Sequence, residues 1–160
     1  MILQAFEVYP RLFVSDWRVA ASEKRLTQLG VVLVVNMAEE VDDPEPHSLR
    51  GKVRFVKFGI WDAGPQHLDF DERALVVRRV HLAVEEIQSG IAAGPVLVHC
   101  NAGLSRSVVT AMAWLHRHQD MSWEDAEKRL FKTHPGARLH NVDLRRHVQE
   151  WLPGGGASLM

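Results

Sequence analysis

The chain has 160 residues, of which 46% are hydrophobic and 24% are charged, a size that predicts one domain with a proper core and is too small for two. Its formal net charge of −1 provides no overall field to attract nucleic acid or an anionic membrane, and no stretch approaches the roughly 18 apolar residues of a membrane span. A single cysteine, together with an N-terminus that lacks the pattern of a signal peptide, predicts a cytoplasmic protein.

The first third of the chain predicts extended pieces around one helix. FEVYPRLFV predicts two short extended segments that bend at Pro10. Residues 22–30 predict a helix with Ser22 as its N-cap and Gly30 just after its end. The β-branched run over 31–36 predicts a strand that is buried on both faces, and residues 53–60 predict a second strand.

An acidic, proline-containing segment over 38–51 separates these two strands and predicts a surface loop. Five carboxylates in it could together bind a cation. We favour a solvated loop instead, because exposed charge costs little free energy. The five residues are Glu39, Glu40, Asp42, Asp43 and Glu45.

The rest of the chain alternates helices with one further strand. A helix over 71–89, a buried strand over 96–99 and a helix over 105–118 that is apolar nearly all round are predicted. Ser122 caps another helix, and a last helix lies within 140–152. This order predicts an α/β fold with a mostly parallel central sheet flanked by helices, in one domain over 1–152 with a flexible tail over 153–160.

The third strand leads into the segment with the clearest chemistry. In open parallel sheets, ligands bind beyond the carboxyl ends of the strands, where Cys100 and Asp62 would share an edge. The turn over 101–106 reaches a helix N-terminus with free N–H groups, and Gly103 allows these groups to converge on an anion. Arg106 adds a planar fork that matches two phosphate oxygens, and a thiol in that field ionises readily. We therefore interpret Cys100 as a nucleophile aimed at phosphorus.

The string HCNAGLSRS resembles the His-Cys-x5-Arg-Ser phosphate loop of the cysteine-dependent protein tyrosine phosphatase superfamily. The longer pattern VLVHC.AG.SRS, followed by A.A.L, is similar to the dual-specificity phosphatase branch. PRLFVSD and VVNMAEE earlier in the chain extend the resemblance over most of its length. The resemblance implies a phosphatase-like α/β fold with its phosphate loop between a strand and a helix.

Position by position, the resemblance also implies roles. Cys100 would attack phosphorus to form a phosphocysteine, and Arg106 would bind the transferred group. Ser107 would donate to the leaving thiolate, while His99 would brace the loop and tune the thiolate. Asp62 would protonate the leaving oxygen and then activate water. The residues that would surround the phosphate are His99, Asn101, Ala102, Gly103, Leu104, Ser105 and Arg106.

Some of these assignments have competing interpretations. Asp69 and Asp71 lie in the same stretch as Asp62, but either suits the N-cap of the helix over 71–89, so Asp62 is the chosen acid. His99 could also be an ordinary core histidine. Of the Pro-Asn-x-x-Phe pattern that often closes the family's domain, the chain keeps only Asn141.

The resemblance implies phosphorylated proteins as substrates, at phosphotyrosine and at phosphoserine or phosphothreonine. A phosphatase of phosphoinositide, RNA 5′-phosphate or phosphoglucan, or a phosphate-binding module without turnover, is the alternative. Uncharged residues at loop positions 101, 102, 104 and 105 disfavour the lipid alternative.

No cofactor and no metal is expected, because His116 and His118 lack further ligands. The later basic residues form either a solvated face or a shoulder that attracts acidic phosphopeptides. These are Lys128, Arg129, Lys132, Arg138, Arg145 and Arg146.

Overall fold

A computed structural model describes residues 3–63, 65–137 and 142–152. Five strands form one sheet in the order β1-β2-β5-β3-β4. Only β1 and β2 pair antiparallel, and the other three pairings are parallel, as the sequence predicted. The strands are β1 (Ala5–Tyr9), β2 (Leu12–Ser15), β3 (Leu33–Ala38), β4 (Arg54–Ile60) and β5 (Val96–His99).

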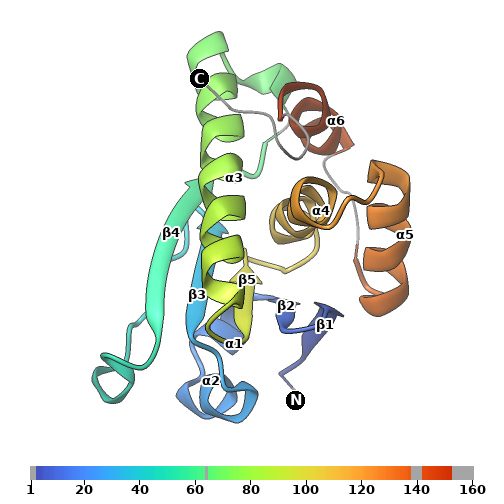
Figure 1. Ribbon diagram of the computed structural model, residues 1–160. Coiled ribbons are helices and arrows are strands. Elements are labelled where there is room, and N and C mark those ends of the chain that lie inside the picture. Colours follow the sequence, from blue (N-terminus) through green and yellow to red (C-terminus); the bar gives the residue numbers. More distant parts are fainter. Residues whose placement is uncertain (1–2, 64, 138–141, 153–160) are drawn as a thin grey trace.

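Helices cover both faces of the sheet (Figure 1). The long helix α3 crosses one face, with α4, α5 and α6 on the same side, while α1 and α2 lie on the opposite side. No helix in the described part of the chain is long and apolar enough to span a membrane. The helices are α1 (Trp17–Ala20), α2 (Glu23–Leu29), α3 (Phe70–Ile91), α4 (Arg106–His118), α5 (Trp123–Thr133) and α6 (Val142–Trp151), with 3-10 turns at η1 (His47–Leu49) and η2 (Pro65–His67).

Side-chain caps place the helix starts near where the sequence predicts them. Ser22 Oγ accepts from the backbone N–H of Arg25 at 3.2 Å, and Gly30 ends α2 in the left-handed conformation with a φ of 68°. At the start of α3, Asp69 and Glu72 form a capping box, each side chain accepting from the other's backbone N–H. Asp69 is therefore the N-cap, and the helix runs somewhat beyond both ends of the predicted 71–89.

The sheet separates two hydrophobic clusters, and burial on both faces explains its continuous apolar strands. Side chains of β3 alternate between the clusters, with Val35 on the α3 side and Val34 on the α2 side. Helix α4 is buried continuously from Arg106 to Leu115, which confirms the prediction of a helix running through the core. The loop before α4 is thus anchored by a rigid element at each end.

Three details of the sequence prediction differ from the structure or fall outside it. Strand β3 is shifted two residues toward the C-terminus from the predicted 31–36, and the short helix α1 was not anticipated. Asn141, Arg138 and the predicted tail over 153–160 lie outside the described residues.

Candidate active site

A pocket of about 320 Å³ opens at the carboxyl edge of the sheet, where the loop after β5 faces the segment after β4. The side chain of Cys100 is only 2% exposed although it lines the pocket, so the thiol is deeply placed. Asp62, from a distant part of the sequence, meets Cys100 and Arg106 here. The lining residues are Asp62, Cys100, Asn101, Ala102, Leu104, Ser105 and Arg106.

The turn of this loop requires glycine at position 103. Gly103 has a φ of 72°, and a Cβ there would lie 2.6 Å from the carbonyl carbon and oxygen of Ser15. The same neighbouring segment receives the loop at a second point, where the backbone N–H of Trp17 donates to the carbonyl of Asn101 at 3.0 Å. The connection from β2 to α1 therefore supports the outer side of the loop.

His134, which directly follows α5, also supports the loop, a role that was not predicted from the sequence. Its Nε2 donates to the Gly103 carbonyl at 2.8 Å, and its ring stacks on Phe6 with centroids 4.0 Å apart. Burial lowers the pKa of His134 even though the bond to Gly103 acts in the opposite direction, so the ring is neutral at pH 7. A histidine before Pro-Gly carries no sequence signal for this role.

Ser107 contacts the thiol directly. Its Oγ lies 3.2 Å from Cys100 Sγ, and the side chain is fully buried in the first turn of α4. A hydroxyl at this distance can donate to a thiolate.

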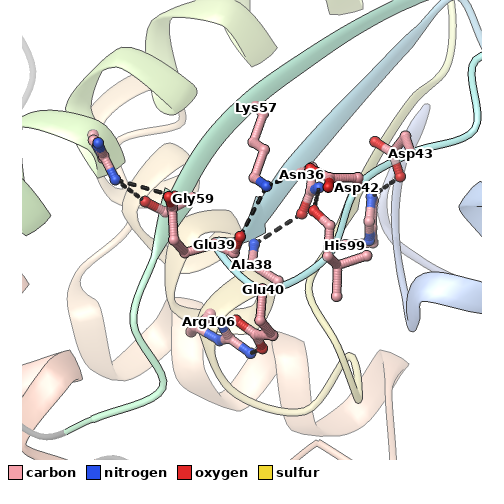
Figure 2. A network of polar contacts seen from close by, with 12 residues as sticks. Asn36, Ala38, Glu39, Glu40, Asp42, Asp43, Lys57, Gly59, His99 and Arg106 are labelled. Atoms are coloured by element: carbon pink, nitrogen blue, oxygen red, sulfur yellow. Dashed lines mark hydrogen bonds and ion pairs between the residues drawn. The ribbon is translucent and has the colours of Figure 1, made fainter.

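Arg106 is 3% exposed and is held by two other segments of the chain. Figure 2 shows its pairing with Glu40. Arg106 Nη1 donates to Glu40 Oε2 and to the Ile60 carbonyl, each at 2.8 Å, and its Nη2 donates to Glu40 Oε1 at 2.5 Å. These contacts use three of the five guanidinium N–H groups. Nε–H and one Nη2–H form no hydrogen bond with the described residues, and they lie along one edge with the spacing that two phosphate oxygens require.

Glu40 and Arg106 stabilise each other in their charged forms. The hydrogen bond from Arg106 lowers the pKa of Glu40 to about 2, and Asn101 adds to the effect. Burial alone would lower the pKa of Arg106, but the bond to Glu40 and the charges of Cys100, Glu40 and Asp62 together raise it. Both side chains are therefore ionised over the whole range in which an assay would be run.

The prediction of a solvated acidic loop was wrong for Asp43, and Glu40, although exposed, is paired with another side chain. Glu40 binds Arg106, and the Asp43 side chain is only 7% exposed, with Oδ1 2.8 Å from His99 Nε2. Asp42 behaves as predicted, with a side chain 92% exposed. The missed signal is the buried Asn36 just before the acidic run, which accepts from the Ala38 N–H and donates to the Val41 carbonyl, and so bends the loop back toward the site.

Strand β4 and helix α3 hold this loop in place (Figure 2). Lys57 Nζ donates to the Glu39 carbonyl at 2.9 Å and to Asp42 at 2.8 Å, while Arg79 donates to Glu39 and to the Gly59 carbonyl. At Gly59 an added Cβ would lie 2.7 Å from Glu39 Cα, so only glycine lets the two backbones approach this closely.

Asp62 is exposed at the side of the pocket opposite the loop. Just before it, Trp61 lies under the Arg79 guanidinium, 5.6 Å from the ring centroid. Asp69 is occupied as the N-cap of α3, and Asp71 lies in the first turn of that helix. Of the three candidate carboxylates, Asp62 is the one that lines the pocket.

The structure brings a buried thiol after a parallel strand, a glycine turn and an arginine at the start of the next helix to one pocket, the arrangement that the resemblance implied. Residues 12–152 match the family described as dual specificity phosphatase, catalytic domain. The chain belongs to this family.

Individual relatives are distant. The chain is 28% identical over 145 residues to human protein phosphatase Slingshot homolog 3, covering 89% of this chain and 20% of that protein. It is 27% identical over 143 residues to dual specificity protein phosphatase 26 of Bos taurus, covering 89% of this chain and 64% of that protein. It therefore spans less than two thirds of either relative.

Among solved structures, that of human DUSP28 is similar with a TM-score of 0.74 and 23% identity, covering 94% of this chain and 96% of that one. At this identity the similarity supports the fold alone.

Proposed function

We propose that this domain is a cysteine-dependent protein phosphatase, which hydrolyses phosphotyrosine and also phosphoserine or phosphothreonine in proteins through a phosphocysteine intermediate. The observation that carries the proposal is the grouping of Cys100, Arg106, Ser107 and Asp62 around one pocket. The chemistry needs no cofactor or metal, and its dependence on a free thiol suits the reducing cytoplasm.

In the first half of the reaction, Cys100 Sγ attacks phosphorus and the bond from phosphorus to the substrate oxygen breaks. The free edge of Arg106 and the N–H groups of the loop bind the phosphoryl oxygens, where charge develops. Asp62 gives its proton to the departing oxygen. Glu40 supports this step because it fixes which edge of Arg106 faces the phosphate.

In the second half, the Asp62 carboxylate takes a proton from water, and the water oxygen attacks phosphorus. The bond from phosphorus to sulfur breaks, and Cys100 leaves as a thiolate. Ser107, 3.2 Å from the sulfur, donates to that thiolate and makes it a better leaving group.

The Ser105 hydroxyl also supports the proposal that the pocket binds an anion. Its Oγ is buried and forms no hydrogen bond with the described residues, although the residue lines the pocket. An unsatisfied buried hydroxyl costs about 1–3 kcal/mol, and a phosphate oxygen could accept from it.

Loss of the nucleophile is the direct test. We expect the purified domain to hydrolyse phosphotyrosine and phosphothreonine peptides, and Cys100→Ser to lose about 10⁴-fold or more of kcat. Phosphoinositides, 5′-phosphorylated RNA and phosphoglucan belong in the same panel. Preferential turnover of one of these would replace the protein substrate, and binding of phosphate without turnover would identify a phosphate-binding module. Retained activity in Cys100→Ser would contradict the mechanism.

A further inference from the structure

His99 contacts both the backbone of Cys100 and the acidic loop. Figure 2 shows its contact with Asp43. His99 is the last residue of the central strand β5 and is fully buried. Its Nδ1 lies 3.1 Å from the Cys100 carbonyl oxygen, so Nδ1 must carry a proton, because a carbonyl only accepts. Its Nε2 lies 2.8 Å from Asp43 Oδ1.

The second contact indicates which form of the ring is present. A neutral ring with its proton on Nδ1 would leave an unprotonated Nε2 at 2.8 Å from the Asp43 carboxylate, a contact without attraction between charges. A ring protonated on both nitrogens has a favourable contact at each. The contact with Asp43 is not aligned as a straight hydrogen bond, so its strength comes from opposite charge at short range.

Among the described residues, Asp43 is the negatively charged group in contact with the His99 ring. The neighbouring strands present the uncharged Ser15 and Asn36 opposite His99. The adjacent Asp42 pairs with Lys57 instead. The ring also contacts the backbone carbonyl of the adjoining Cys100. A buried imidazolium without a counter-charge would destabilise the fold. Asp43 offsets this cost because its carboxylate carries the opposite charge.

We propose that Asp43 is a positioning residue of the active site, which keeps His99 protonated and thereby favours the thiolate form of Cys100. The ring contacts the Cys100 carbonyl, so its positive charge lies within the same residue pair as the thiol, and a nearby positive charge favours a thiolate. The inference rests on the proposed function for the identity of the nucleophile. It adds that one loop serves both halves of the site, with Glu40 orienting Arg106 and Asp43 acting on Cys100 through His99.

The test compares two neighbouring aspartates. The rate of Cys100 alkylation by iodoacetamide is measured against pH in the wild type, Asp43→Asn and Asp42→Asn. We expect the midpoint of the profile to rise by about one pH unit in Asp43→Asn, because a neighbouring positive charge is lost or weakened. That shift corresponds to about tenfold slower alkylation below the midpoint. The exposed Asp42→Asn should match the wild type.

A double-mutant cycle tests the route through the ring. In a His99→Asn background, Asp43→Asn should cause no further shift, because the ring on which Asp43 acts is gone. An equal shift in both backgrounds would overturn the proposal, as would an unchanged profile in Asp43→Asn.

The wild type provides a readout that does not depend on a variant folding. Nitrogen-15 NMR of the histidine rings at pH 7, assigned by comparison with His99→Asn, should show both His99 nitrogens protonated. A neutral His99 ring would overturn the proposal. Alkylation and NMR do not require turnover, so absence of phosphatase activity in the wild type would count against the proposed function only.

Discussion

The two sides of the pocket are built differently. The phosphate-loop side is buried and braced, with Arg106 held by Glu40 and Ile60, and Gly103 packed on Ser15 and bonded to His134. The opposite side presents Asp62 as an exposed residue at the end of β4. Its effect on the loop side is through charge, because the Asp62 carboxylate helps to raise the pKa of Arg106.

This difference indicates a division of labour. A fixed loop stabilises the charge that develops on the phosphoryl group, which is the same for every phosphomonoester. An exposed acid donates to the leaving oxygen, which varies from substrate to substrate. Variants on the loop side should therefore affect all substrates alike, whereas variants of the acid should discriminate between leaving groups.

The largest effect that separates the two sides is expected for Asp62→Asn. It keeps the shape of the side chain and removes the proton, so kcat on phosphopeptides should fall by about 10²–10⁴-fold. On an aryl phosphate with a very acidic phenol the loss should be much smaller. Asp69→Asn and Asp71→Asn are the controls, and should lower the melting temperature more than the leaving-group dependence. The opposite pattern would show that the acid is misassigned.

Arg106→Lys should reduce kcat by about 10²–10³-fold on every substrate, because an ammonium cannot bind Glu40 and phosphate at the same time with planar pairs of N–H groups. The measurement is the ratio of wild-type to variant kcat over a series of leaving groups. A ratio that changes with the acidity of the leaving group would contradict the claim that the loop side acts on all substrates alike.

Ser107→Ala should lower kcat by about 10–10²-fold, the value of one hydrogen bond to a charged group. The loss should fall on breakdown of the phosphocysteine, since Ser107 contacts the sulfur that leaves in that step. Rapid-quench kinetics should then show a burst of product followed by slow turnover. A single slow phase without a burst would contradict this role.

The smallest effect concerns Glu40 and pH. The pKa of Glu40 is lowered to about 2 by its bond to Arg106, so the pair adds stability above pH 4.5 that is lost as the pH falls from 4.5 toward 2. Because the Glu40 side chain is 45% exposed, solvent screens the pair and its contribution is small. Glu40→Gln should melt below the wild type at pH 6, and the difference should shrink by pH 3. A constant difference across this range would show that the stability comes from packing.

The fold could be predicted from the sequence where local chemistry determines it. Ser22, Asp69 and Ser122 cap helices through contacts three residues away, and these signals lie in the sequence itself. Continuous β-branched runs likewise indicated strands buried on both faces. The boundaries of β3 could not be obtained this way, because they depend on its partners β4 and β5.

The pocket was predictable to a similar extent. The loop from Cys100 to Ser107 lies in one stretch, and its spacing and glycine indicate a phosphate site. Glu40, Asp43 and His134 were missed, since each acts on the loop from a distant segment. Charge in a polar loop normally indicates solvent, and the role of Asn36, which is buried and bends the loop back to the sheet, was not recognised in the sequence.

The contacts of Arg106 also indicate when the phosphate site forms during folding. Arg106 joins Glu40, 66 residues away, and Ile60, 46 residues away. Pairings over such separations close long loops, and the lost chain entropy is recovered only when the surrounding elements are already in contact. Strand β3 must pair with β5, and β4 with β3, before the guanidinium can contact either partner. We therefore expect the phosphate site to form late, after most of the secondary structure, so that a partly folded chain carries the thiol without an organised phosphate loop.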